Sequence, residues 1–150
     1  MKIEYVEGDL LASRETVIAH GCNARGVMGS GIAKSIRNEY PSTYSDYRAK
    51  YESTGLELGD VVVTRTLERT ILNIISQEYY GRDPHVMYVS YDAIKKAILR
   101  INEMGYMRVG FPKIGAGLAN GNWETISNII EATSDFTPVV YYLESPTEKW

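Results

Sequence analysis

The sequence predicts an α/β fold, a three-layer α/β/α sandwich with a mixed central sheet, formed by one domain over residues 1–150. Three observations support this prediction. Short apolar runs rich in β-formers alternate with segments of helical periodicity along the whole chain. Two glycine-rich loops each stand between such a run and a helix. One pair of runs is close enough to form a hairpin, which makes the sheet mixed rather than purely parallel.

In the first part of the chain, β-forming runs at 3–6 and 16–20 predict two strands, and the second has the apolar character of a buried strand. A helix is predicted to start near Ser30, because apolar residues recur every four positions after it. Pro41 ends this helix and can open a second one that continues through Tyr51.

The middle of the chain predicts the hairpin, because the β-rich runs at 61–66 and 70–76 are separated by only three residues. The rest of the chain predicts two further helices and two further strands. The helices are each preceded by a polar residue of the kind that caps a helix N-terminus. These elements are the helices capped by Ser90 and Asn122 and the strands at 108–112 and 137–143.

The composition excludes several classes of function. The formal net charge is −3, so the chain as a whole does not attract nucleic acid or an anionic membrane. There is no 18-residue apolar run and no signal-peptide core at the N-terminus. The single cysteine suits a reducing compartment, and the two histidines lie far apart with no ligand cluster around either. We therefore expect a cytoplasmic monomer with no metal, no cofactor and no membrane or nucleic-acid partner.

The two glycine-rich loops, at 21–31 and 115–121, are the features of the sequence that indicate a binding site. Glycine lets backbone N–H groups approach an anion, and a following helix adds the positive end of its dipole. The first loop spaces its glycines G-x-x-G-x-G, which is the wrong order for a dinucleotide-binding fingerprint, and no Gly-Lys-Ser/Thr ending exists. Either loop alone is equally well explained by tight turns. Two of them in one small domain favour a site for a diphosphate with a sugar on each side.

Three segments resemble those of the macrodomain family. The stretch 17–23 with 29–33 resembles the family's first phosphate loop, and 111–118 resembles its second. Residues 8–10 resemble its adenine-binding element. The order and spacing match over nearly the whole chain, most like small stand-alone bacterial and bacteriophage macrodomains and ADP-ribose 1″-phosphate phosphatase-like members. The resemblance implies ADP-ribose or a derivative as the ligand, with an ADP-ribosylated protein as a further candidate partner.

The resemblance also implies roles for individual residues. Asp9, with Leu10 beside it, would bind the adenine, which Tyr142 and Leu143 would flank. Asn23 would bind hydroxyls of the distal ribose, since an amide both donates and accepts hydrogen bonds. The two phosphate loops would supply mainly backbone N–H groups. The residues implied there are Gly29, Ser30, Gly31, Ile32 and Ala33 in the first loop and Pro112, Ile114, Gly115, Ala116, Gly117 and Leu118 in the second.

The prediction for catalysis depends on His20 and Asp83. Family members that remove ADP-ribose from protein use a lysine in mid-chain and an aspartate in the second loop; here 76–83 holds no lysine, and the loop position is Ala119. The phosphatase branch has a histidine where this chain has His20, and Asp83 is its candidate partner. An imidazole suits proton transfer or attack near neutral pH, and Asn23 would position a water.

The leading prediction is therefore hydrolysis of a distal-ribose derivative, most simply ADP-ribose 1″-phosphate. Several alternatives remain open: a non-catalytic ADP-ribose-binding module, a deacylase or de-ADP-ribosylating hydrolase, and an interaction protein with a vestigial cleft. His20 is equally explained as a buried strand histidine, and Asp83 as a turn residue before a proline. Cys22 is interpreted as an inert small hydrophobe rather than a nucleophile.

Overall fold

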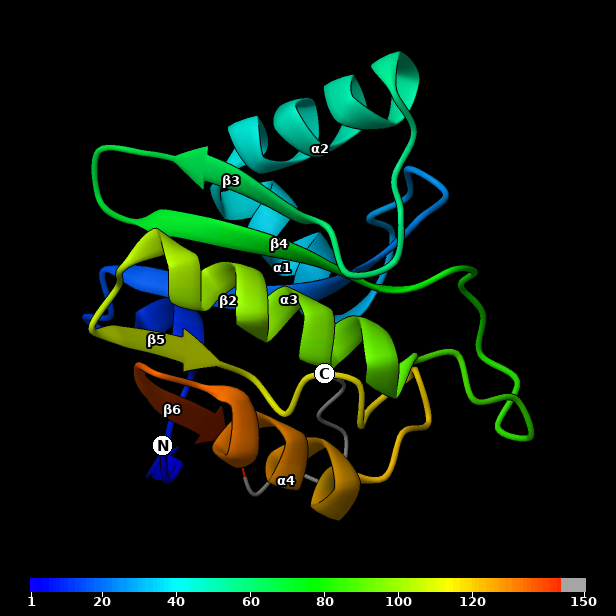
Figure 1. Ribbon diagram of the computed structural model, residues 1–150. Helices are drawn as coiled ribbons and strands as arrows, with labels where there is room; N and C mark the ends of the chain where they lie inside the picture. Colours follow the sequence, from blue (N-terminus) through cyan, green and yellow to red (C-terminus); the bar gives the residue numbers. More distant parts are fainter. Residues whose placement is uncertain (144–150) are drawn as a thin grey trace.

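The computed structural model describes residues 1–143, which form one six-stranded sheet with helices on both faces (Figure 1). The strand order is β1-β6-β5-β2-β4-β3, and every neighbouring pair is parallel except β3 with β4. The predicted α/β/α fold with a mixed sheet is confirmed. The strands are β1 (Glu4–Glu7), β2 (Val17–Asn23), β3 (Val61–Arg65), β4 (Thr70–Gln77), β5 (Arg108–Phe111) and β6 (Thr137–Tyr142).

Helices α1 (Gly31–Glu39) and α2 (Pro41–Ser53) pack on one face of the sheet, and α3 (Tyr91–Met104) and α4 (Trp123–Thr133) pack on the other (Figure 1). A 3-10 helix, η1 (Leu10–Ala12), follows β1. Side chains of β2 alternate between the two layers, as the pleat requires. Ala19 packs with the α3/α4 layer, whereas Ile18 packs with α1.

The helix boundaries agree with the capping residues in the sequence. Ser90 accepts a hydrogen bond from the backbone of Ala93, and α3 ends at Gly105, whose φ of 79° is left-handed. Asn122 caps α4 in the same way. Pro41 occupies the first position of α2, as predicted. No helix within residues 1–143 has the length and apolarity to cross a membrane.

One boundary differs from the prediction, and it matters for the site. Strand β2 does not end at His20 but continues through Gly21 and Cys22 to Asn23. The physical reason is pairing with β4: Gly21 lies opposite Ile74, and Cys22 lies opposite Ile75. The first glycine-rich loop therefore begins after Asn23. The five parallel strands all end at one edge of the sheet, where α/β folds bind their ligands.

Candidate functional site

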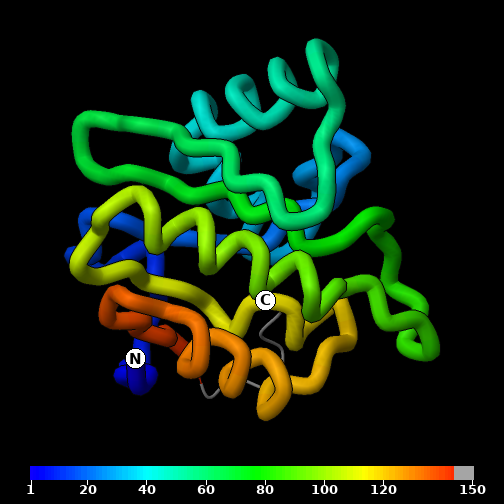
Figure 2. Tube along the Cα trace, viewed as in Figure 1, coloured from blue at the N-terminus to red at the C-terminus, as the bar shows by residue number. Residues whose placement is uncertain are grey.

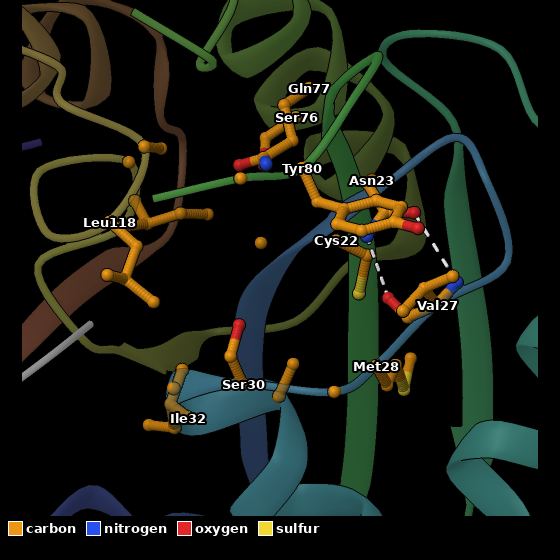
Figure 3. Close-up of a pocket in the computed structure, with 18 of the residues that line it drawn as sticks. Cys22, Asn23, Val27, Met28, Ser30, Ile32, Ser76, Gln77, Tyr80 and Leu118 are labelled. Carbon is orange, nitrogen blue, oxygen red and sulfur yellow. Dashed lines mark hydrogen bonds between the residues drawn. The ribbon is translucent and has the colours of Figure 1, made fainter. Parts of the chain in front are cut away.

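A cavity of about 280 Å³ opens where β2, β4 and β5 end (Figure 3). Three stretches of chain surround it: a first loop after β2 (24–30) with the start of α1, a second loop after β5 (112–122), and a third segment between β4 and α3 (78–90). Its lining residues are Gly21, Cys22, Asn23, Val27, Met28, Gly29, Ser30, Gly31, Ile32, Ala33, Ser76, Gln77, Tyr80, Gly81, Arg82, Pro112, Ile114, Gly115, Leu118 and Ala119.

The first loop is shaped by the side chain of Asn23. Its Oδ1 accepts hydrogen bonds from the backbone N–H of Arg25 (2.9 Å) and Val27 (3.4 Å), and its Nδ2 donates to the Val27 carbonyl at 2.7 Å (Figure 3). The buried hydroxyl of Tyr47 on α2 donates to the Asn23 carbonyl at 2.6 Å. Asn23 lines the cavity, but most of its hydrogen bonds hold the loop that leads into α1.

The N-terminus of α1 faces the cavity without a side-chain cap. Ser30 is the N-cap residue, yet its hydroxyl makes no capping hydrogen bond, and its oxygen points into the cavity (Figure 3). The first helical hydrogen bond runs from Lys34 N–H to the Ser30 carbonyl. The N–H groups of Gly31, Ile32 and Ala33 therefore have no partner within the helix. They add their positive partial charge to the dipole that ends there.

The second loop needs glycine for its shape. Gly115 has a φ of 78°, and a Cβ at this position would lie 2.8 Å from Val89 Cγ2. Its carbonyl accepts a hydrogen bond from Gly121 N–H at 2.7 Å, which closes the loop. The N–H groups of Gly115 and Leu118 donate to no acceptor among residues 1–143. The second loop therefore brings further free amides to the cavity.

Gly21 allows the floor of the cavity to close. A Cβ on Gly21 would lie 2.6 Å from the hydroxyl oxygen of Ser76 and 3.3 Å from Ile114 Cγ1. The first contact is closer than packed atoms come, and the second is tighter than most, so glycine lets β4 and the second loop approach β2 at this point.

The third segment is tied to the first loop at the far side of the cavity. Ala24 N–H donates to the Gln77 carbonyl at 2.9 Å, and the Arg25 guanidinium forms an ion pair with Glu78 at 3.1 Å. The same guanidinium lies 4.0 Å from the ring centroid of Tyr79. The positive charge of Arg25 is therefore already balanced by a neighbour.

The third segment is also tied to the second loop. Asn120 Nδ2 donates to the carbonyl of Asp83 at 2.9 Å, and Tyr88 N–H donates to that of Ala119 at 2.8 Å. Tyr80 and Arg82 lie between the contacts with the first loop and those with the second. The ring of Tyr80 extends over the cavity (Figure 3), and Arg82 is one of the lining residues. The chain between β4 and α3 projects beyond the sheet as the green loop in Figure 2.

The lining is almost without formal charge. Among residues 1–143, no Asp, Glu, His or Lys lines it, and Arg82 is the one charged residue that does. Cys22 lines the cavity but is buried, and burial raises the pKa of its thiol far above neutral pH. The thiol is therefore protonated, in agreement with its interpretation as inert. No group of three or more residues that would suit a metal ion occurs within residues 1–143.

His20 does not reach the cavity. It is fully buried on β2, and its Nε2 donates a hydrogen bond to Asn73 Oδ1 at 2.6 Å. Asn73 Nδ2 in turn donates to the Val62 carbonyl. Burial lowers the pKa of His20 to about 4, and the bond to Asn73 offsets only part of that effect. The predicted placement against a distal phosphate is corrected: His20 occupies the position of a buried strand histidine.

Asp83 also lies outside the cavity lining. Its Oδ1 accepts a hydrogen bond from the backbone N–H of His85 at 2.9 Å, which is the geometry of a turn residue, and its side chain is exposed. The structure therefore does not bring His20 and Asp83 together, and the predicted catalytic pair is not assembled.

The predicted adenine-binding residues are partly brought together. The Gly8 N–H donates to the Tyr142 carbonyl at 2.8 Å. The next residue, Asp9, therefore lies near the end of β6, where Leu143 follows Tyr142, and it is exposed. Asp9 Oδ1 accepts from Leu11 N–H and thereby caps η1. Leu10 is different: it is fully buried and packs in the core. The prediction that Leu10 contacts a ligand is corrected, because η1 places this side chain in the core with Ile18 of β2 and Ile36 of α1.

In the second loop, Ala116 and Gly117 lie between lining residues but do not line the cavity themselves. Several lining residues were not predicted. Gly21 and Cys22 belong to the predicted first glycine-rich loop, whereas in the structure they are the end of β2 and form the floor of the cavity. The third segment has no periodicity or glycine spacing that indicates a site. The lining residues without a predicted ligand-binding role are Gly21, Cys22, Val27, Met28, Ser76, Gln77, Tyr80, Gly81, Arg82 and Ala119.

Comparison with known proteins gives concordant results. The family model described as "Macro domain" matches residues 19–130, which include all three segments of the cavity. A 17.5 kDa protein from the tk-vs intergenic region of Enterobacteria phage T4 is 29% identical over 93% of this chain and 95% of its own length. An ADP-ribose 1″-phosphate phosphatase of Scheffersomyces stipitis is 26% identical over 86% of this chain and 93% of its own.

A solved structure of Thermosipho africanus DarTG in complex with ADP-ribose has the same fold, with a TM-score of 0.79. It is 20% identical and covers 96% of this chain and 42% of the other. At that identity the likeness concerns the fold. The fold, the cavity and the family model therefore agree on one architecture.

Proposed function

Because the chain belongs to the Macro domain family, we propose that its cavity binds the ADP-ribose group of a nucleotide. One observation carries the proposal. The uncapped N-terminus of α1 and the free amides of the second loop border the same cavity, and no acidic side chain from the described residues 1–143 lines it. Amides of this kind are donors for a diphosphate, and the helix dipole favours its negative charge.

The strand order supports an extended ligand along the carboxyl edge of the sheet. Along this edge, Asp9 and Tyr142 lie at the ends of β1 and β6. The second loop follows β5, the first loop follows β2, and the third segment follows β4, in the order of the strands in the sheet. In the proposal, Asp9 accepts a hydrogen bond from the adenine amino group, and the diphosphate lies between the two loops. The distal ribose lies near Asn23, whose Nδ2 has one hydrogen left for a hydroxyl.

Binding of ADP-ribose is expected to raise the melting temperature of the protein. A ligand at about 100 times its Kd stabilises the native state by about 2.7 kcal/mol, which is about 5 to 10 °C for a domain of this size. Differential scanning fluorimetry with ADP-ribose, and with AMP and ribose 5-phosphate as half-ligands, measures this. The proposal requires ADP-ribose to raise the melting temperature more than AMP or ribose 5-phosphate does. An unchanged melting temperature with saturating ADP-ribose would refute it.

We further propose that the bound substrate is ADP-ribose 1″-phosphate, which the protein hydrolyses to ADP-ribose and phosphate. The phosphatase name of the Scheffersomyces relative and the arginine in the cavity support this. Water would attack the phosphorus, the bond between phosphorus and the 1″ oxygen would break, and that oxygen would take up a proton. Because no Asp, Glu or His of residues 1–143 lines the cavity, Asn23 and the substrate's own diphosphate would position the water.

The same lining also favours a second candidate, a module that binds ADP-ribose without catalysis, because no residue described by the structure offers a general base there. Phosphate release from ADP-ribose 1″-phosphate distinguishes the two. Release above the uncatalysed rate supports the hydrolase, and binding without release supports the module.

A further inference from the structure

We infer that Arg82 forms a subsite for an anionic group on the distal ribose and so selects substrates that carry a phosphate there. This inference rests on the proposed function. It deepens that function, because it names the residue that would tell ADP-ribose 1″-phosphate from ADP-ribose.

Arg82 gives the cavity its one formal charge among residues 1–143. It is exposed, and it is the only charged residue in that part of the chain that lines the cavity. Among residues 1–143 it forms no ion pair, whereas Arg25 is paired with Glu78. A guanidinium without a carboxylate partner presents its full fork of donors to a ligand, and that fork matches the oxygens of a phosphate.

Arg82 lies on the β4 side of the cavity. It follows β4, which lies on the far side of β2 from β5 and β6. The proposed adenine end, at Asp9 and Tyr142, lies at the opposite end of the strand row. Glu78, the first residue of the third segment, accepts a hydrogen bond from Ala24 N–H at the start of the first loop. Arg82 therefore borders the end of the cavity that would hold the distal ribose.

The hydrogen-bond donors around the cavity come from separate segments of the chain. The amides of the α1 N-terminus and of the second loop that lack a partner among residues 1–143 belong to residues that line the cavity, and they would satisfy the diphosphate. Arg82 comes from a separate segment and would be free to meet another anion. The neighbouring carboxylate of Asp83 is outside the lining and accepts a hydrogen bond from His85 N–H. Asp83 is therefore engaged with its own turn.

An Arg82→Gln variant tests the inference against two ligands. It should weaken the interaction with ADP-ribose 1″-phosphate about tenfold more than that with ADP-ribose, because only the first ligand loses a charge-assisted contact. Calorimetry gives both Kd values, and KM from phosphate release replaces the first if the ligand is turned over. Arg82→Lys, which keeps the charge, should recover part of the loss.

The control variant is Arg65→Gln. Arg65 is an exposed arginine at the end of β3, and because β3 is antiparallel it lies at the opposite edge of the sheet. It should leave both affinities unchanged. Equal weakening of both ligands by Arg82→Gln would overturn the inference, because Arg82 would then contact the shared diphosphate. No effect on either ligand would overturn it as well. If the wild-type protein binds neither ligand, the proposed function itself fails.

Discussion

A Ser30→Asp variant is expected to bind ADP-ribose about 100-fold more weakly than the wild-type protein while becoming slightly more stable. Ser30 precedes α1 and does not cap it, and its oxygen points into the cavity (Figure 3). An aspartate there would accept hydrogen bonds from the first-turn amides of α1 and complement its dipole, adding about 0.3–1 kcal/mol of stability. The same carboxylate would occupy the donors of the diphosphate and repel its charge, which at about 4 Å costs several kcal/mol.

The opposite signs of the two effects make this variant informative. Calorimetry gives the Kd and urea unfolding gives the stability. Ser90→Asp is the matched control, because Ser90 already caps α3 and does not line the cavity. It should leave ADP-ribose binding unchanged. If Ser30→Asp bound ADP-ribose as tightly as the wild-type protein does, the N-terminus of α1 would not be a diphosphate site.

The second large effect is a pH dependence of stability caused by His20. Burial lowers the pKa of His20 to about 4 from an ordinary value of 6.5. Between these two values the unfolded chain binds a proton that the folded protein does not, so stability falls as the pH falls from about 6.5 to about 4. The contribution lost between pH 7 and pH 5 is roughly 2 kcal/mol.

His20→Gln removes this titration and keeps an N–H donor for Asn73. Urea unfolding at pH 7 and pH 5 should therefore show a smaller loss for His20→Gln than for the wild-type protein. His85→Gln, at an exposed histidine, should behave like the wild-type protein. A variant and a wild-type protein with the same pH dependence would mean that His20 is not held neutral in the core.

The elements of the fold were predictable because local signals and burial agree. Ser90, Gly105 and Asn122 delimit helices through local hydrogen bonds and backbone freedom, and the structure uses all three. Pro41 opens α2 for a similarly local reason. The two glycine-rich loops were predictable because a close approach of backbone requires glycine wherever it occurs, as at Gly115.

The role of His20 could not be predicted from its neighbours in sequence. Its side chain faces the α1/α2 layer, and whether that direction opens into the cavity depends on how far β2 continues. Pairing with β4 carries the strand to Asn23, which leaves His20 three residues below the edge. Leu10 is a similar case, because its burial depends on contacts with Ile18 and Val139, which are distant in sequence.

The third segment was missed for the same physical reason. Nothing in the local sequence around Tyr80 and Arg82 fixes their position, since the segment has no regular structure. It is held by the ion pair between Arg25 and Glu78 and by the bond from Asn120 to the carbonyl of Asp83. Both contacts join parts of the chain that are far apart in sequence, so a pattern search along the chain does not detect them.

The central claim is that amides of two separate loops hold one diphosphate. Titration of ¹⁵N-labelled protein with ADP-ribose, followed by NMR, tests it residue by residue. The account predicts that the amide signals of Gly31, Ile32 and Ala33 and those of Gly115 and Leu118 shift most, along one common binding curve. Shifts confined to one of the two loops, or found only elsewhere in the protein, would contradict it.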